Sequence, residues 1–266
     1  MSTKLSIVGL SLLSISALSI GLSSQAYGQN DYWHQRVSLF ERLPVQPGDI
    51  VFLGNSITDG GEFQELFGRE DVKNRGIVGD VINGVRKRLS QVTSGHPSKI
   101  FLLIGINDVS HAHSPEKIAA MYETLVEEIR TQSPGTQLYI QSLLPINNDF
   151  KRYKNLLGRE KVVPRVNELL PSIAERHGAE YVDLWPAFAD EEGKLSRAYT
   201  TDGLHLSGAG YKRWAEMVRP LLDNNSGIST GEDELMGTDS SSDDSSTETS
   251  SPEMDIQMPV IINRVE

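Results

Sequence analysis

Short apolar runs alternate with longer amphipathic segments through the middle of the chain. The runs predict buried strands at Ile50–Leu53, Ile100–Ile104, Leu138–Ser142 and Tyr181–Leu184, with a weaker one at Val72–Arg75. The longer segments repeat apolar residues every three or four positions and predict helices at Tyr32–Leu43, Asp80–Val92, Pro115–Ser133, Glu160–His177 and Ser207–Asp223. Strands that alternate with helices form parallel sheets covered on both faces. The pattern therefore predicts an α/β fold, a three-layer αβα sandwich around a five-stranded parallel sheet of the flavodoxin-like kind.

In open parallel sheets, functional sites form beyond the carboxyl ends of the strands. Three segments of this chain follow predicted strands and carry polar residues and glycines: Gly54–Gly61, Gly76–Asp80 and Gly105–His113. The fourth strand leads into Leu144–Lys154, a polar segment without periodicity that would line or cover a pocket. We expect the chemistry of this protein at that edge of the sheet.

Residues 1–28 have the pattern of a secretory signal. Lys4 precedes the apolar, serine-rich stretch Leu5–Leu22, and Ala26 and Gly28 are small residues at a cleavage position. A membrane anchor is the alternative, but the many serines and glycines make this stretch weakly hydrophobic and favour cleavage. We expect an exported protein, periplasmic or secreted, with no stable membrane insertion after cleavage and a folded domain over residues 29–225.

Most of the net charge of −11 belongs to the C-terminal tail. Residues 226–266 contain ten acidic residues and one basic residue, and their Ser/Thr-rich composition predicts disorder. The remaining chain is close to neutral, so it lacks the positive charge typical of nucleic-acid binding, and we expect no such partner. The absence of cysteine excludes disulfides, thiol catalysis and cysteine metal sites. The oligomeric state is left open.

Ser56 follows the first predicted strand in the segment DIVFLGNSITDG. A serine at this place is often the N-cap of a helix, and a nucleophile is the other interpretation. The common serine-hydrolase motif G-x-S-x-G is absent, since Thr58 stands two residues later. A nucleophilic serine also needs a base and a group that orients the base.

His205 is the best candidate for that base. It lies in TTDGLHLSGAGY, just before the last helix, and Asp202 precedes it by three residues with Gly203 between them. A carboxylate at this spacing can orient an imidazole. Ordinary structural roles explain His34, His96 and His177. His111 and His113 lie near Asp108, but two histidines two residues apart in a loop are a weak metal pattern, and no third ligand is evident. We expect no metal.

Two further segments carry hydrogen-bond donors at the same edge of the sheet. Asn107 follows the strongest predicted strand, where its amide can donate to a developing oxyanion. Gly79 follows the second strand and leaves its backbone N–H accessible.

Together the blocks G-N-S, G-x-x-G-D, G-x-N-D and D-x-x-H resemble the GDSL or SGNH hydrolases, in the same order over about residues 49–222. The resemblance implies that Ser56 is the nucleophile and that Asp202 and His205 complete the triad. It also implies an oxyanion hole of Gly79, Asn107 and the Ser56 N–H, and no cofactor. The aspartate that gives the family its name is Asn55 here, while the four catalytic positions are intact.

The resemblance implies a serine esterase that cleaves short-chain carboxylic esters through an acyl-enzyme. The polar segment Pro145–Leu157 favours O-acetyl groups on carbohydrates, so that the partner is a small-molecule or carbohydrate ester. Activity similar to platelet-activating-factor acetylhydrolases, lysophospholipases or thioesterases is an alternative. A binding module without activity is another.

Overall fold

The computed structural model describes residues 24–223, with side chains from Asp31 onward. Most of the predicted signal and all of the predicted acidic tail lie outside these residues. The first helix, α1 (Ser24–Arg42), begins eight residues before its predicted start. Among the described residues no helix combines the length and the apolar character needed to cross a membrane.

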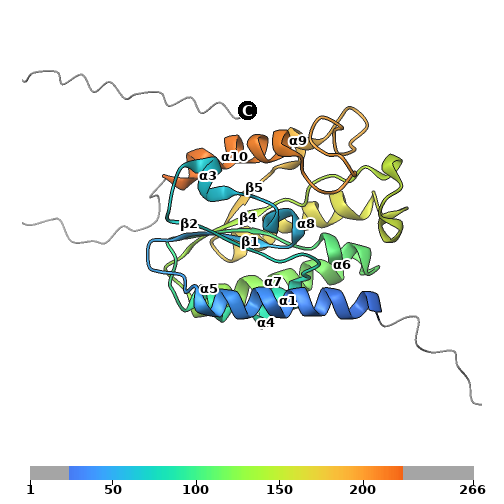
Figure 1. The fold of residues 1–266 in the computed structure, drawn as a ribbon. Helices are drawn as coiled ribbons and strands as arrows, with labels where there is room; N and C mark the ends of the chain where they lie inside the picture. The colour runs from blue at the N-terminus through green and yellow to red at the C-terminus, as the bar shows by residue number, and fades with distance from the viewer. Residues whose placement is uncertain (1–23, 224–266) are drawn as a thin grey trace, which may run out of the picture. The chain divides into compact units, whose positions relative to one another are not determined.

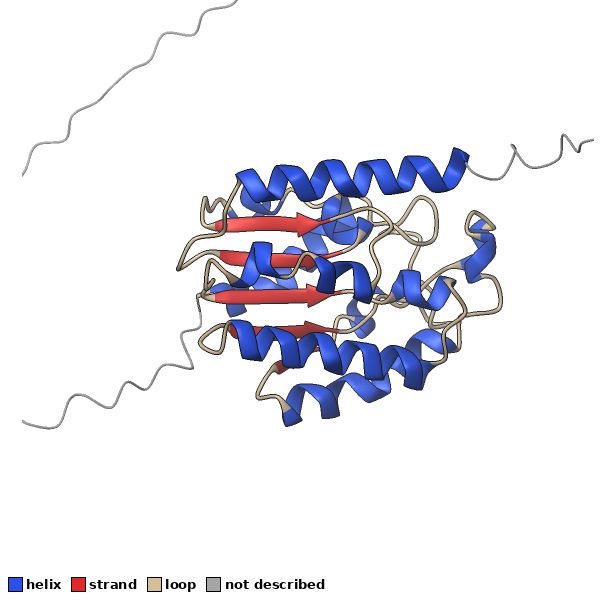
Figure 2. Ribbon diagram, turned by 90° about the horizontal axis from the view of Figure 1, so that it is seen from below, coloured by secondary structure: helices blue, strands red, loops and turns tan. Residues whose placement is uncertain are grey.

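Five parallel strands form the sheet at the centre of the described residues (Figure 2). They are β1 (Ile50–Gly54), β2 (Val72–Gly76), β3 (Lys99–Leu103), β4 (Gln137–Gln141) and β5 (Glu180–Val182). Their order is β2-β1-β3-β4-β5, which is the flavodoxin-like order. The predicted α/β sandwich with a five-stranded parallel sheet is confirmed.

Helices cover both faces of this sheet (Figure 1). One face carries α1, α4 (Ile82–Lys87), α5 (Ser90–Thr93) and α7 (Pro115–Gln132), and α8 (Val162–Arg176) packs against α7. The other face carries α3 (Phe63–Phe67) and α10 (Gly208–Leu222). The remaining elements are short and join the strands to these layers: α2 (Ser56–Asp59), α6 (Ile106–Ser110), η1 (Asn148–Phe150), η2 (Lys154–Leu156) and α9 (Trp185–Phe188).

The predicted helix over Asp80–Val92 is wrong as a single element. It is divided into α4 and α5, and the division falls at Arg88, whose side chain is buried and bonded away from the helix. Apolar periodicity did not reveal α2, α3, α6 or α9, because a helix of one turn is too short to display a repeat of 3.6 residues.

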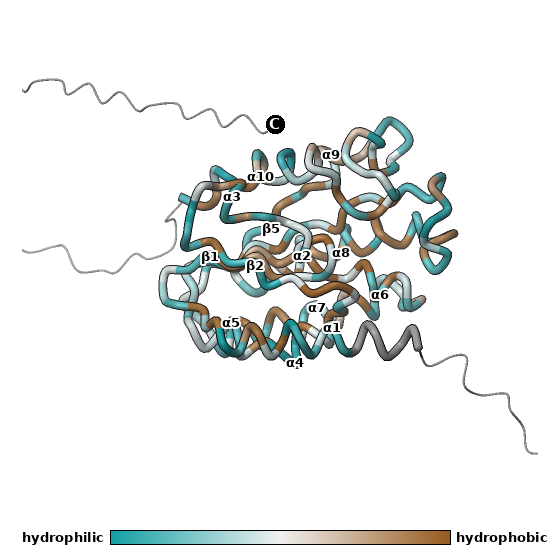
Figure 3. Tube along the Cα trace, in the orientation of Figure 1, coloured by the Kyte–Doolittle hydropathy of each residue, from teal (hydrophilic) through white to brown (hydrophobic). Residues whose placement is uncertain are grey.

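An aromatic cluster joins the sheet to α3 and α10. The ring of Phe52 on β1 stacks on Phe63 of α3 at 4.0 Å and on Phe101 of β3 at 4.9 Å. Trp214 of α10 meets Phe63 edge to face at 5.1 Å and donates from Nε1 to Oε1 of Gln141 across 2.7 Å. Figure 3 shows hydrophobic residues concentrated along the strands. This packing fixes the start of α10, which follows the D-x-x-H segment, relative to the end of β1.

Candidate active site

Ser56 is the first residue of α2, directly beyond the carboxyl end of β1. The N-cap of this helix is Asn55, whose Oδ1 accepts a hydrogen bond from the Ile57 N–H at 3.0 Å. The interpretation of Ser56 as the cap is therefore wrong. Because the Asn55 side chain makes the capping hydrogen bond, the hydroxyl of Ser56 is available for another partner.

That partner is His205. Its Nε2 lies 2.9 Å from the Ser56 hydroxyl, and its Nδ1 lies 2.8 Å from Oδ2 of Asp202. The side chain of His205 is 34% exposed, and Ser56 is half-buried, so the reacting end of this series is not sealed from solvent. The structure thus brings Ser56 and the distant Asp202–His205 turn, both predicted from the sequence, into one line of hydrogen bonds. This arrangement suits proton transfer from a hydroxyl to an imidazole.

The turn from Thr200 to His205 holds the carboxylate beside the imidazole. Oδ1 of Asp202 accepts backbone N–H bonds from Leu204 at 2.9 Å and from His205 at 2.8 Å. The buried Thr200 hydroxyl donates to the His205 carbonyl at 2.7 Å and accepts from the Gly203 N–H at 2.9 Å. One aspartate oxygen therefore shapes the turn, while the other faces the histidine.

Gly79 lies in a tight turn after β2. The Asp80 N–H donates to the Ile77 carbonyl at 3.1 Å, and Gly79 has φ of +76° at the third position, as a type II turn requires. Among residues 24–223 the N–H groups of Gly79 and Ser56 have no acceptor. Both belong to segments that follow adjacent strands, so both are available to a ligand at this edge.

Asn107 lies on α6, which follows β3. Its Nδ2 donates to the Asp80 carbonyl at 2.8 Å, which places the amide next to the Gly79 turn. An amide nitrogen carries two hydrogens, so one remains for a ligand. Gly79 and Asn107 are thus joined through Asp80, beside the end of the strand that leads to Ser56.

A family model described as the GDSL-like lipase/acylhydrolase family matches residues 52–213, which contain all of these groups. The chain belongs to this family. Its relatives include platelet-activating factor acetylhydrolase IB subunit alpha2 of Homo sapiens, 28% identical over 180 residues, which are 65% of this chain and 74% of that protein. Subunit alpha1 of Pongo abelii is also 28% identical, over 65% of this chain and 75% of its own length.

Solved structures of the GDSL family and its relatives have the same fold. A protein of Streptococcus pneumonia, described as a candidate platelet activating factor, matches with a TM-score of 0.69 at 27% identity, over 77% of this chain and all of its own. A catalytic mutant of an acetylxylan esterase from Geobacillus stearothermophilus matches with a TM-score of 0.54 at 19% identity, over 68% of this chain and 95% of its own. At 19% identity, the match to the acetylxylan esterase shows a shared fold only.

The departure from the GDSL pattern at Asn55 has a local explanation. Asparagine and aspartate are equally good N-caps, and here the asparagine Oδ1 makes the capping bond. The fully buried Asn55 carries no charge into the core beside Ser56. The replacement therefore preserves the start of the helix that presents the serine.

The hydrogen bonds to Asp202 keep its carboxyl ionised. Burial alone would raise its pKa, but donors from Tyr153, from His205 and from the backbone outweigh burial and hold the pKa of Asp202 well below its usual range. An ionised carboxylate can stabilise an imidazolium on its neighbour.

Several residues that shape this GDSL site escaped the sequence analysis. Asn74 on β2 donates from Nδ2 to the carbonyls of Thr58 at 2.7 Å and Gly61 at 2.8 Å, and so closes the end of α2. Tyr211 of α10 donates to the Ile57 carbonyl at 2.8 Å. These partners are far apart in the chain, and no local pattern indicates such contacts.

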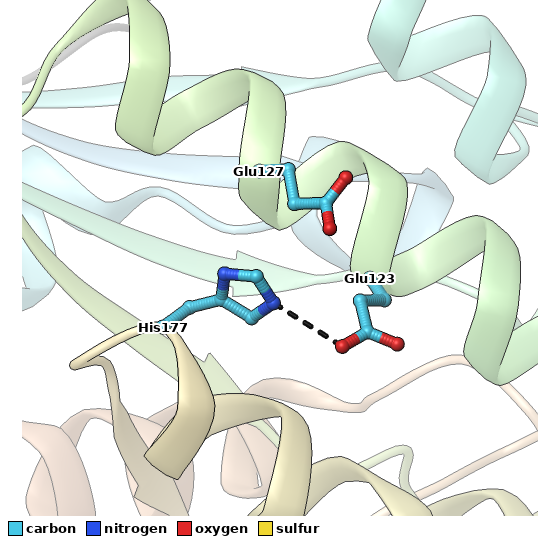
Figure 4. A group of neighbouring side chains, drawn as sticks. All are labelled: Glu123, Glu127 and His177. Atoms are coloured by element: carbon cyan, nitrogen blue, oxygen red, sulfur yellow. Dashed lines mark hydrogen bonds and ion pairs between the residues drawn. The ribbon is translucent and has the colours of Figure 1, made fainter.

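The remaining histidines have other neighbours. The side chain of His111 is exposed to solvent. The neighbouring Asp108 is buried instead, and its Oδ2 accepts the Ile82 N–H at 3.1 Å. His177 ends α8, and its ring and the carboxylates of Glu123 and Glu127 offer metal-ligand atoms within 4.8 Å of one another (Figure 4). Glu123, however, already accepts His177 at 3.2 Å and Arg176 at 2.9 Å on the same oxygen. The ion pair between Arg176 and Glu123 therefore joins the end of α8 to α7.

Proposed function

We propose that this protein is a serine ester hydrolase, and the observation that carries the proposal is the hydrogen-bonded series Ser56–His205–Asp202. His205 accepts the Ser56 proton while the serine oxygen attacks an ester carbonyl. The oxyanion accepts hydrogen bonds from the N–H groups of Ser56 and Gly79 and from the Asn107 amide. His205 then donates its proton to the leaving alcohol.

Water completes the reaction in a second half that mirrors the first. His205 takes a proton from water, which attacks the acyl group on Ser56, and returns that proton to the serine oxygen as the acid leaves. Throughout both halves Asp202 stays ionised and keeps the imidazole in one orientation. Neither half requires a metal or an organic cofactor.

For the acyl group we propose acetyl or another short chain. The curated relatives, at 28% identity, are named acetylhydrolases, which supports a short acyl group. For the leaving alcohol we propose a carbohydrate, since the segment after β4 is rich in polar residues.

Only some polar residues of that segment are free to contact an alcohol. Asn147, Asn148 and Asp149 are used inside the protein: Asn147 donates to the Leu195 carbonyl at 2.9 Å, Asn148 to the Leu156 carbonyl at 2.8 Å, and Asp149 accepts Lys194 at 2.9 Å. The exposed cations Lys151, Arg152 and Lys154 remain on the surface of the segment. They suit an alcohol with many hydroxyl groups or with a negative charge.

The second candidate substrate is the acetyl ester named in the relatives, platelet-activating factor. The observation in its favour is the sequence identity to these proteins over 65% of this chain. The two candidates share the acyl group and differ in the alcohol, so substrate comparison separates them.

The test is a rate series on aryl acetate, butyrate and octanoate with wild type, Ser56→Ala and Ser172→Ala, which removes an exposed hydroxyl on α8. We expect rates that fall with acyl length and a loss on the order of 10⁴-fold or more in Ser56→Ala only. Ser56→Ala with most of the wild-type rate would overturn the proposal. Acetate release from acetylated xylo-oligosaccharides and from platelet-activating factor then identifies the alcohol, and rates that rise with acyl length contradict the short-chain assignment.

Export is a separate part of the proposal, supported by the composition of residues 1–28. Expression of the full chain followed by fractionation and N-terminal sequencing tests it. We expect the mature protein outside the cytoplasm with a new N-terminus close to residue 29. An uncleaved chain that stays in the cytoplasm contradicts it.

A further inference from the structure

Tyr153 lies against both the carboxylate and the imidazole of the candidate triad. Its hydroxyl is 2.6 Å from Oδ2 of Asp202 and 2.8 Å from Nδ1 of His205. Its ring meets the His205 ring edge to face, with 5.6 Å between centroids and 68° between planes. The two polar contacts fall on the same two atoms that make the aspartate–histidine bond.

The segment that carries Tyr153 is fastened to the turn between Asp202 and His205. The Asn147 N–H donates to the Gly203 carbonyl at 2.8 Å, and the Asn147 side chain reaches the Leu195 carbonyl. Asn148 bonds the Leu156 carbonyl and Glu160, which closes the segment on itself. The position of Tyr153 is therefore set by a folded segment, and its hydroxyl contact with the pair is built into the fold.

Counting hydrogens assigns the direction of each bond. A carboxylate only accepts, so the single phenol hydrogen of Tyr153 goes to Oδ2 of Asp202. When Nδ1 of His205 carries its hydrogen, that N–H faces both the same Oδ2 and the phenol oxygen. Burial, followed by the hydrogen bond to Asp202, raises the pKa of Tyr153 above its ordinary value, so the phenol keeps its hydrogen.

We propose that Tyr153 is a positioning residue that tunes the Asp202–His205 pair. By donating to Oδ2 it shares the negative charge that would otherwise act on the imidazolium alone, and so His205 releases its proton to the leaving alcohol more readily. The phenol also fixes the separation of the two side chains. This inference rests on the proposed esterase function, because it assigns how the base of that reaction is adjusted.

Replacing Tyr153 by Phe removes none of the other charged or titratable side chains near the pair. Arg152 neighbours Tyr153 in the chain and acts on it electrostatically. Tyr211 of α10 interacts electrostatically with Asp59 of α2 and with Asp202. A shift in the pH profile of kcat/KM in Tyr153→Phe can therefore be assigned to the loss of the phenol contact.

The first test is the pH profile of kcat/KM in Tyr153→Phe, which keeps the ring and removes only the hydroxyl. Without the phenol the carboxylate acts wholly on the imidazolium, so we expect the acid limb to move to higher pH by roughly one unit. We expect kcat to fall about threefold to tenfold with little change in KM. Tyr199→Phe is the control, since the Tyr199 ring packs edge to face on Phe188 and its hydroxyl has no hydrogen bond among the described residues. Its profile should match wild type.

The second test does not depend on turnover. In a Ser56→Ala background the Nδ1 proton of His205 is followed by proton NMR as a far-downfield resonance, with and without Tyr153→Phe. We expect the resonance to move further downfield without the phenol, because the N–H then bonds Asp202 alone. An unchanged resonance together with an unchanged acid limb, in a variant with the wild-type circular dichroism spectrum, overturns the inference. Retained activity in Ser56→Ala instead contradicts the esterase proposal, while the resonance still reports on Tyr153.

Discussion

Arg88 donates from Nε to Oδ2 of Asp80 across 2.7 Å, with both side chains removed from solvent. Its Nη2 also donates to the Gly54 carbonyl at 3.0 Å. One guanidinium therefore connects the turn that carries Gly79 with the end of β1, immediately before Asn55 and Ser56. The proposed oxyanion donors Ser56 and Gly79, which lie in segments after β1 and β2, depend on this connection for their relative position.

Loss of Arg88 should destabilise the protein strongly. Arg88→Met leaves the Asp80 carboxylate buried without its cation, and breaking a buried pair typically costs about 3–5 kcal/mol. Urea unfolding followed by tryptophan fluorescence measures the effect. In the double variant with Asp80→Asn no uncompensated charge remains, so the loss should be smaller than the sum of the single losses. A change below about 1 kcal/mol in Arg88→Met would contradict this account.

Removing the Asn107 amide should slow the reaction far more than it weakens binding. One oxyanion donor is worth about 10²–10³-fold in kcat, and the charge it stabilises exists only in the transition state. Steady-state kinetics of Asn107→Ala on an aryl acetate tests this, with KM expected to change little. Asn83→Ala, at an exposed asparagine on α4 whose Nδ2 contacts the sulfur of Met121, is the matched control. Equal rates in the two variants would remove Asn107 from the proposed mechanism.

Gly203 should tolerate no side chain. A Cβ there would lie 2.2 Å from the Asn147 carbonyl oxygen, and φ is +88°. Gly203→Ala must therefore push the segment that carries Tyr153 away from the Asp202–His205 turn, with loss of both activity and stability. Gly193→Ala separates strain from contact, since φ there is +74° with open space around the Cβ.

We expect Gly193→Ala to cost about 1–2 kcal/mol of unfolding free energy, from the left-handed backbone alone. Its kcat should remain at the wild-type value. Thermal and urea unfolding, together with esterase assays, measure the pair of variants. If the two variants lose the same amount of stability and activity, the contact with Asn147 has no role.

Asp108 should make stability fall as the pH rises from about 4 to 6. Burial raises the pKa of Asp108 to about 6 from 3.8, so the native state holds this proton more tightly than the unfolded chain does. The stabilisation is complete below pH 4 and is lost as the pH rises through 6, in total about 3 kcal/mol.

Asp108→Asn should flatten this dependence, because an amide does not titrate. Urea unfolding at pH values between 4 and 7 measures it, with the exposed Glu191→Gln as control. Asp202 acts in the opposite sense in a separate window: its lowered pKa adds stability above about pH 4, which is lost at lower pH. A wild type and an Asp108→Asn variant with parallel profiles between pH 4 and 6 would contradict the assignment.

The strands and the longer helices were predictable because they reflect local burial. Each strand lies within two residues of its predicted position, since consecutive apolar residues such as those of β1 and β3 must be removed from water on both faces. The predicted start of α7 at Pro115 is correct, and the hydroxyl of the preceding Ser114 caps the helix by accepting the Lys117 N–H. The prediction of one helix over Asp80–Val92 was wrong because the side chain of Arg88 points inward to Asp80, and apolar periodicity does not indicate such a polar contact.

The sequence alone was sufficient to predict the fold and to name the candidate triad and oxyanion residues. Alternating apolar runs require a parallel sheet, and parallel strands place the segments with Ser56, Gly79 and Asn107 at one edge. Only the tertiary structure decided how these groups are held. Asn55 caps α2 in place of Ser56, and the Tyr153 hydroxyl reaches Asp202 and His205 from a separate segment. Such bonds depend on the conformation of whole loops, which a pattern of neighbouring residues does not predict.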